Sequence, residues 1–239
     1  LNYYNQEGVQ RAVNYDRINF SVNTTANKGR FKIGESINLF TSKSETSNGP
    51  GTSPFVMHAL PQLPVFNDST LNGYGIPTRE VAGQQNASNP ALAMDLRRRE
   101  ARTYGVNGNV FAEVEIIDGL KIKSSLNFRA NLSNTTEQNP RIDQGIAVSA
   151  SGAPQYGITE SNYTEWLSDN TITYDKGIGL HKFTVLAGAT WRDRSIENVF
   201  VTGLDVREGL ESVVGDNAIF GNGIIIHRNQ SLLGRVIYS

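Results

Sequence analysis

The sequence contains no cysteine among its 239 residues. Disulfide scaffolds, thiolate metal sites and cysteine nucleophiles are therefore excluded together. No run of 18 consecutive apolar residues occurs either, so the sequence predicts no transmembrane helix. The formal net charge is only −1 and basic residues do not cluster, which gives no indication of a nucleic-acid partner.

Histidine is scarce as well. The three histidines, His58, His181 and His227, lie far apart, and none has a second residue at the spacing of a metal ligand. No nucleophile, base and acid form a recognisable set along the chain. We therefore expect no enzyme activity, no bound cofactor and no metal site.

What the sequence does contain is alternation, which is clearest from Tyr104 to Leu132. Apolar and polar residues alternate there along two stretches that Asp118-Gly119 separates. Side chains alternate faces along a strand, so this pattern predicts a hairpin with one apolar and one polar face, joined at an Asp-Gly turn. The residues expected on the polar face, and in a barrel on the lumen side, are Asn109, Glu113, Lys121, Lys123, Asn127 and Arg129.

The two stretches are long for strands. Strands of soluble proteins have about 5–6 residues, whereas a strand that crosses a bilayer at a tilt needs roughly 9–11. A long hairpin of a soluble sandwich or β-solenoid fits this stretch equally well when it is taken alone. The mean hydropathy of −0.36 excludes neither interpretation, because a barrel exposes only every second residue to lipid.

The connections between the expected strands alternate in length. Short turns are expected at residues 27–29, 118–119 and 176–180, and longer connections at 5–15, 45–102, 135–161 and 203–228. The remaining strands are expected at 1–4, 17–25, 30–44, 163–175, 181–202 and 230–239. Outer-membrane barrels have short periplasmic turns and longer extracellular loops. The pattern favours an all-β, transmembrane antiparallel barrel over a soluble meander.

Aromatic spacing supports a membrane position. Trp166 and Tyr174 share a strand face eight residues apart, and so do Phe183 and Trp191. Eight tilted residues climb ~20 Å, close to the ~25 Å between the aromatic girdles of such barrels. We therefore expect these four residues at the two lipid interfaces. Packing of the same rings inside a sandwich is the alternative.

The segment 45–102 is rich in proline, glycine, asparagine and serine, yet it also carries apolar residues. A short helix is expected at 91–99, after Asn89-Pro90. Aromatic and histidine side chains in the long connections could contact a substrate or a lid protein, or could pack the connections on themselves. The candidates are Phe55, His58, Phe66, Tyr74 and Tyr156.

Two stretches resemble a known family. Residues 181–188 read HKFTVLAG and residues 231–239 read SLLGRVIYS. They resemble strands of the SusC/RagA-like TonB-dependent outer-membrane transporters, although Ile237 stands where these usually have asparagine. Residues 119–123 (GLKIK) and 89–91 (NPA) fit the same family in the same order, so that the resemblance covers almost the whole chain.

The resemblance implies a barrel of 22 strands around a plug domain, in the bacterial outer membrane. Residues 1–239 would supply about eight strands, without the plug or the N-terminal segment that contacts TonB; we interpret the chain, which starts at Leu1, as part of a longer protein. The implied function is import of oligosaccharides or peptides. The implied partners are a SusD-like surface lipoprotein, TonB, an oligomeric nutrient, and outer-membrane lipid and lipopolysaccharide.

Two other classes of function stay open from the residues alone. One is a secreted or surface β-rich glycan-binding or adhesin protein, which would fold in water without detergent. The other is an outer-membrane enzyme built on a barrel, which the lack of a catalytic set disfavours.

Overall fold

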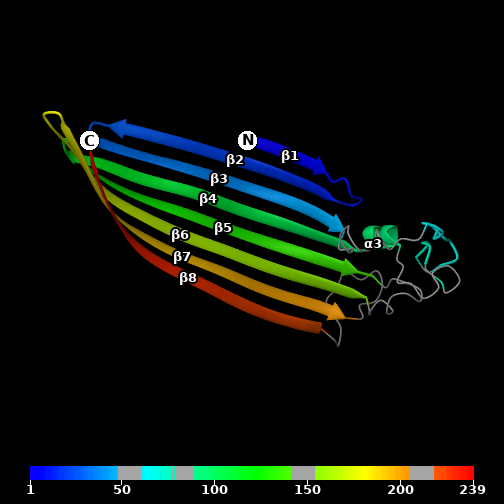
Figure 1. Ribbon diagram of the computed structural model, residues 1–239. Helices are drawn as coiled ribbons and strands as arrows, with labels where there is room; N and C mark the ends of the chain where they lie inside the picture. Colours follow the sequence, from blue (N-terminus) through cyan, green and yellow to red (C-terminus); the bar gives the residue numbers. More distant parts are fainter. Residues whose placement is uncertain (48–60, 71, 77, 79–88, 141–153, 205–217) are drawn as a thin grey trace.

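The computed structural model is a single antiparallel sheet of eight strands in the order β1-β2-β3-β4-β5-β6-β7-β8 (Figure 1). The structure describes residues 1–47, 61–70, 72–76, 78, 89–140, 154–204 and 218–239. The elements are β1 (Asn2–Glu7), β2 (Asn14–Lys28), β3 (Phe31–Ser47), α3 (Pro90–Leu96), β4 (Arg98–Ile117), β5 (Leu120–Asn139), β6 (Gln155–Ile178), β7 (His181–Leu204) and β8 (Ala218–Tyr238).

The predicted hairpin is present as β4 and β5, with a register shift between Glu115 and Ile117 just before the turn. Val110 lies opposite Leu126, and Asn109 lies opposite Asn127. Directly opposed residues of antiparallel strands point to the same side, so the apolar and polar rows continue across both strands. We call the face that carries Leu126 the outer face and the face that carries Asn127 the inner face.

The strands extend further than the sequence pattern indicated. The expected connection 135–161 is wrong at both ends, because β5 runs to Asn139 and β6 begins at Gln155. The connection 203–228 is likewise too long, since β8 begins at Ala218, and the turn 176–180 shrinks to Gly179-Leu180. At the ends of β5 and β6 that lie beyond the predicted bounds, both faces are mainly polar, whereas at the start of β8 consecutive residues such as Ile224, Ile225 and Ile226 are apolar. In both cases the period of two that reveals a strand is lost.

Two further boundaries, one near the N-terminus and one at the helix, also differ from the prediction. The connection 5–15 is shorter than expected, because β1 reaches Glu7 and β2 starts at Asn14. The expected helix 91–99 forms as α3 but ends at Leu96, and Arg98 already belongs to β4. Among the described residues no helix is long and apolar enough to cross a membrane.

The two-residue turns at 29–30, 118–119 and 179–180 lie at one end of the sheet, and α3 lies at the other (Figure 1). Gly29, Gly119 and Gly179 adopt positive φ values of 60°, 85° and 61° at these turns, a conformation that other residues adopt at a cost. A Cβ on Gly119 would also lie 2.1 Å from the carbonyl oxygen of Asp175. Hydrogen bonds from Arg30 to the Ile116 carbonyl and to Asp118 join neighbouring turns.

The strands are tilted as in a barrel. Following the register from the first residue of β3 gives Phe31, Val114, Ile122, Ile172 and Ala187. Ala187 lies about six residues beyond the start of β7, so the register shifts by about six residues over four strand steps. If the turns share one height, a rise of ~3.3 Å and a spacing of ~4.8 Å give a tilt of roughly 45°, at the upper end of the usual barrel range.

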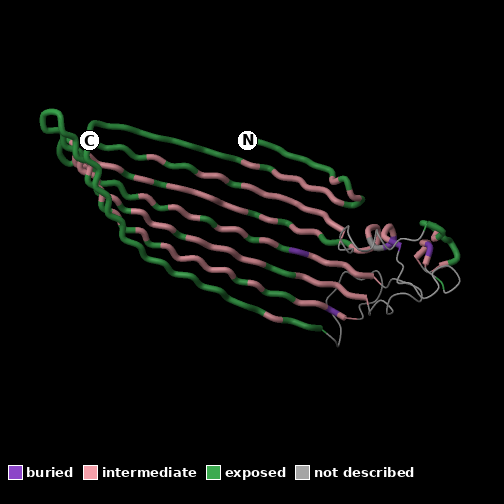
Figure 2. Tube along the Cα trace, in the orientation of Figure 1, coloured by how far each residue is buried: buried purple, intermediate pink, exposed green. Residues whose placement is uncertain are grey.

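The sheet has almost no core of its own. Leu92 in α3 is the one buried hydrophobic residue among those the structure describes, at 3% exposure. Large apolar side chains of the outer face stay open, including Trp191 at 59% and Leu126 at 38%. Figure 2 shows the same distribution, with buried residues nearly absent from the strands. No second layer covers this face within the described part of the chain, so its apolar surface faces outward.

Phenylalanine rings cover glycines on neighbouring strands at four places. The pairs are Gly34–Phe111, Gly105–Phe40, Gly108–Phe128 and Gly221–Phe200. A Cβ added to Gly108 would lie 2.1 Å from the Phe128 ring, and one added to Gly34 would lie 2.5 Å from the Phe111 ring. A ring lying over a strand glycine fills the gap that the missing side chain leaves and helps to fix the register.

Candidate functional site

The outer face changes character at a constant distance from the tight turns. Apart from Glu35 and a few uncharged polar residues, its side chains are apolar for about 12 residues beyond the turns. Further charged groups such as Asp16, Lys43, Arg102 and Asp193 then appear on β2, β3, β4 and β7. At a tilt near 45° about 12 residues climb roughly 28 Å, close to the thickness of a bilayer's hydrocarbon core.

The four predicted girdle residues lie on this face at two levels. Phe183 and Tyr174 lie near the turns, where the Phe183 and Tyr238 ring centroids are 5.1 Å apart. Trp166 and Trp191 lie near the first charged groups, and Trp166 packs on Phe128 with the centroids 5.8 Å apart. The two levels frame the apolar band from below and above.

Polar residues inside the band partly satisfy one another. Ser124 donates a hydrogen bond to Asn170 at 2.7 Å, and Asn170 donates to Ser168 at 3.1 Å. Pairing of this kind lowers the cost of polar groups in an apolar environment. Glu35 also lies on the outer face, opposite Val110 and Thr24, as the alternation in the sequence had indicated.

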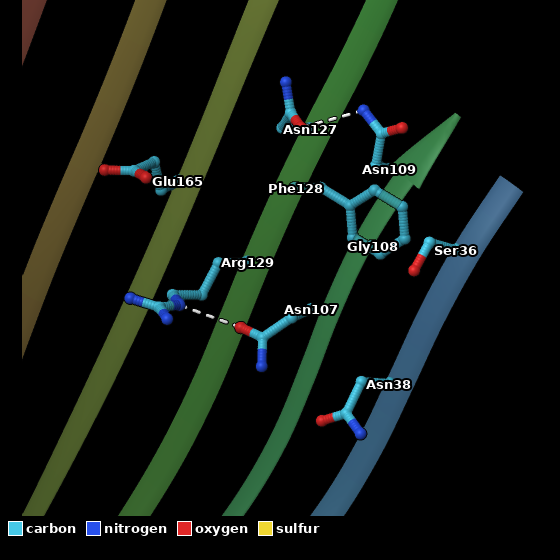
Figure 3. A pocket seen from close by; sticks show the side chains of 9 residues that line it. All are labelled: Ser36, Asn38, Asn107, Gly108, Asn109, Asn127, Phe128, Arg129 and Glu165. Carbon is cyan, nitrogen blue, oxygen red and sulfur yellow. Dashed lines mark hydrogen bonds between the residues drawn. The ribbon is translucent and has the colours of Figure 1, made fainter. Parts of the chain in front are cut away.

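The inner face carries several hydrogen-bonded groups of amides and charges around one hollow (Figure 3). Asn109 donates to Asn127, and Arg129 donates through Nε to Asn107, each over 2.8 Å. The hollow has a volume of about 320 Å³. It is lined by Ser36, Asn38, Asn107, Gly108, Asn109, Asn127, Phe128, Arg129 and Glu165.

Further groups of this kind lie on β6 and β7. Arg192 donates to the Glu165 carboxylate from Nε at 2.9 Å and from Nη2 at 2.6 Å, and Tyr163 donates to the same oxygen at 3.0 Å. Thr190 donates to Asp169 at 2.7 Å. The charges on this part of the wall are therefore held in fixed positions by neighbouring strands.

Cations of the inner face lie over aromatic rings. Arg17 lies 4.3 Å from the centroid of Phe40, and Lys123 lies 5.0 Å from the centroid of Phe111. Lys123 also lies opposite Glu113 in the register, as Lys121 lies opposite Glu115. All six residues predicted for the polar face thus lie on the inner face, and the register brings Asn109, Asn127 and Arg129 to one hollow.

The predicted loop residues divide into three groups. Phe55 and His58 lie outside the described residues. Phe66 and Tyr74 form a bridge with ring centroids 5.3 Å apart, and Tyr74 donates to Asp95 at 2.8 Å. The prediction that Tyr156 lies in a loop is wrong, because Tyr156 belongs to β6, where it pairs with Gln138 and Gly203.

Asn89 organises the described part of the segment between β3 and β4. Its side chain is buried and donates to the carbonyls of Val65 and Gly75, each over 2.9 Å, while its oxygen accepts from the Ala91 amide at the start of α3. Asn89 is therefore the N-cap of α3. Its side chain also links the backbone at Val65 to the backbone at Gly75, and we call these two hydrogen bonds the Asn89 clasp. The sequence showed Asn-Pro before the helix but gave no sign of the clasp.

The helix α3, at the C-terminal end of this segment, contacts the connection between β1 and β2. Asp95 of α3 forms an ion pair with Arg11 at 3.2 Å, and it also accepts a hydrogen bond from the Tyr74 hydroxyl. Partial burial and the hydrogen bond to Asp95 together raise the pKa of Tyr74 above its ordinary value. The neutral phenol therefore donates to Asp95 throughout the physiological pH range.

The described residues can bind another molecule through the hydrogen bonds and charges of their side chains. They contain no group of three or more His, Cys, Asp or Glu residues that could hold a metal ion. The inner face offers hydrogen-bond donors and acceptors to anything that passes along it. Alternation along β4 had placed Asn107 on the polar face, whereas sequence reasoning missed Glu165, Asp169 and Arg192 as members of this wall. Extending the same period of two into β6 and β7 would have placed these three residues on the inner face.

Comparison with known proteins agrees with this geometry. No family model matches the chain. TonB-dependent receptor P3 of Formosa agariphila is 28% identical over 217 residues, and TonB-dependent receptor P26 of the same organism is 27% identical over 206 residues. Each alignment covers 83% of this chain and 20% of the relative, so the chain spans about a fifth of the length of these proteins.

Solved structures give the same fold. The structure of the RagAB peptide transporter superimposes with a TM-score of 0.71 at 17% identity, over 99% of this chain and 27% of that chain. The RagAB peptide importer in its 'open-open' state gives a TM-score of 0.70 at 18% identity, again over 99% of this chain and 27% of that chain. The predicted resemblance, barrel fold and outer-membrane localisation are confirmed: this chain is similar to a part of TonB-dependent receptors and has the fold of a segment of the RagAB barrel wall.

Proposed function

We propose that this chain forms about eight strands of the barrel of an importer that takes up oligosaccharides or peptides in a TonB-dependent manner, together with a SusD-like surface lipoprotein. The observation that carries the proposal is the two-faced wall. Its outer face is apolar over the thickness of a membrane, while its inner face presents an ordered row of amides and charges. The relatives are receptors and transporters rather than enzymes, which supports the same class of function.

In this proposal the inner face is the side along which the solute passes. Both candidate classes of solute carry many hydrogen-bond donors and acceptors, which fixed side-chain amides can match. The hollow between Asn38, Asn109 and Arg129 is open enough to hold a part of such a solute or a loop of the plug. The remaining polar residues, Glu113, Lys121, Lys123 and Asn127, extend the wetted wall on either side.

Trp166, Tyr174, Phe183 and Trp191 would anchor the barrel at the two membrane interfaces. Aromatic side chains prefer these interfaces, where an amphipathic ring meets both acyl chains and head groups. The tight turns then face the periplasm, and the segment between β3 and β4 faces the outside.

The segment between β3 and β4 would cover the mouth of the barrel and contact the substrate or the surface lipoprotein. Phe66 and Tyr74 are the described aromatic candidates, and Phe55 and His58 belong to the same segment. Phe66 is 60% exposed, so its ring is accessible to a partner or to a sugar or peptide group. In this proposal the plug, the remaining strands of a 22-stranded barrel and the contact with TonB would belong to other parts of a longer protein.

Uptake measured in cells tests the proposal. Labelled oligosaccharides and peptides are offered separately to wild-type cells, to cells without the full-length gene, and to cells depleted of TonB. We expect one class of solute to be lost from both mutant strains and restored when the gene is returned. Unchanged uptake of both classes, with the protein recovered in a water-soluble fraction, would support the glycan-binding or adhesin alternative instead.

A further inference from the structure

A second hollow lies on the outer face of β2 to β5, at the end of the sheet that carries α3. Its volume is about 550 Å³, within the range of sites that hold small molecules or parts of larger ones. Most of its lining comes from outer-face positions. The lining residues are Ala12, Asn14, Glu45, Thr46, Arg98, Arg99, Glu100, Arg102, Thr136 and Gln138.

The position of this recess is set by the apolar band below it. On β3 the last large apolar outer-face residue is Leu39, and Lys43 follows four residues later on the same face, after Thr41. On β4 the corresponding residues are Tyr104 and Arg102. The recess therefore begins where the acyl chains would end, at the level of the outer-leaflet head groups.

The recess combines fixed and free charges. Lys43 pairs with Glu45 and, at 3.2 Å, with Glu100, which also accepts from Arg102 Nε at 2.6 Å. Arg98 takes part in no ion pair or side-chain hydrogen bond with the described residues, and it lines the same recess. Three arginines and two glutamates border the space, so its lining is weakly positive.

We propose that this recess binds the phosphorylated sugar head group of lipopolysaccharide. Arginine guanidinium groups bind phosphate through paired, charge-assisted hydrogen bonds. Arg98 and Arg102 lie four residues apart on the same face of β4, with Glu100 between them. Amide, hydroxyl and carboxylate groups of Asn14, Thr136 and Glu45 suit sugar hydroxyls. Carboxylates also accept the divalent cations that bridge phosphates, since these cations prefer oxygen ligands.

The composition of the recess favours a glycolipid over a protein partner. The centre of a protein interface is depleted in charge and enriched in aromatic and other apolar side chains. Here Ala12 is the only apolar residue in the lining. A lipid whose acyl chains lie along Leu39, Val106 and Leu132 would place its head group directly in this space.

Binding measurements on the full-length protein that contains this chain test the proposal. The barrel is reconstituted in phosphatidylcholine nanodiscs, and rough lipopolysaccharide with two lipid A phosphates is titrated and counted by native mass spectrometry. The double variant Arg98→Ala/Arg102→Ala should bind roughly tenfold more weakly, because charge-assisted contacts to phosphate are lost. Dephosphorylated lipopolysaccharide should bind the wild type with a similar loss.

The matched control removes two arginines from the opposite face. Arg17→Ala/Arg129→Ala should leave lipopolysaccharide binding unchanged, because both side chains point to the inner face. If the first double variant no longer forms a heat-modifiable barrel, Arg98→Ala alone preserves the ion pairs and should still weaken binding. Equal loss in both double variants, equal binding of phosphatidylglycerol, or loss of a co-purifying protein without loss of lipopolysaccharide would each overturn the proposal.

Discussion

At the scale of single residues, the face to which a side chain points decides what a substitution costs. Leu126 lies on the outer face near the middle of the apolar band, and Asn127 lies beside it on the inner face, where it accepts from Asn109. We expect Leu126→Arg to lower the free energy of unfolding by roughly 2–4 kcal/mol, because a charge near the bilayer midplane is poorly solvated. Denaturant titration of the barrel in lipid vesicles measures this loss.

Asn127→Arg is the matched control for Leu126→Arg. The same arginine is introduced one position away, but here it enters a wet wall that already contains Arg129. We expect a much smaller change in the free energy of unfolding, limited to the hydrogen bonds of Asn127 with Asn109, the Leu167 carbonyl and Asp169. Equal destabilisation by both substitutions would mean that the outer face does not contact lipid.

Gly108 provides a second test at this scale. The Phe128 ring occupies the place of a side chain at position 108, so a Cβ there would lie 2.1 Å from the ring. We expect Gly108→Ala to destabilise the barrel by about 1–3 kcal/mol, since the ring must leave its position between the strands. Gly177→Ala is the control, because a Cβ at 177 meets no atom within 4 Å. The difference between the two denaturation midpoints is the quantity to measure, and no difference would contradict a packing role for the ring.

At the scale of the elements, the sequence predicted where strands exist better than where they end. Alternation was clear where one face is apolar, as from Leu120 to Leu132, and the structure confirms that hairpin apart from a register shift between Glu115 and Ile117. Beyond the apolar band both faces of β5 and β6 are mainly polar, both faces of β8 carry isoleucines, and residues such as Thr135 and Glu160 have no period that would mark them as strand. Backbone hydrogen bonds to the neighbouring strands extend β5, β6 and β8 there, and such pairing cannot be deduced from one strand alone.

The orientation of the elements predicts what is accessible from outside the cell. An epitope inserted after Ser47 should be labelled on intact cells, because the tight turns lie at the opposite end of the sheet. An epitope between Gly179 and Leu180, in the turn first placed at 176–180, should be labelled only after the outer membrane is opened. Antibody binding to whole and permeabilised cells gives the readout. Labelling of both sites in unbroken cells would refute the orientation.

At the scale of the whole molecule, the candidate wall was only half visible in the sequence. Lys121, Asn127 and Arg129 were placed on one face by alternation within their own strand. Glu165 and Arg192 join them through a register that shifts with the strand tilt, and a shift of that kind comes from closure of the barrel rather than from a local pattern. The clasp made by Asn89 is equally non-local, since it connects Val65 with Gly75.

The segment between β3 and β4 also acts at the scale of the whole molecule. Asn89 holds Val65 beside Gly75, and the Phe66 ring lies on Tyr74, so the described part is ordered around its own contacts. Full burial of each apolar side chain in this segment would contribute ~1.5–3 kcal/mol, enough to hold it against a plug or a lipoprotein. Its prolines restrict the unfolded chain and so reduce the cost of ordering.

Replacing residues 52–67 with a glycine-serine linker of equal length should therefore abolish uptake of the cognate oligomer. The barrel should still reach the outer membrane in a heat-modifiable form, because no strand is altered. A control variant that carries Phe66→Ala alone should reduce uptake less, since it removes one exposed ring and leaves the Asn89 clasp in place. Growth on the oligomer as the sole nutrient measures the effect. Normal growth of the linker strain would mean that the segment neither closes the barrel mouth nor holds a partner there.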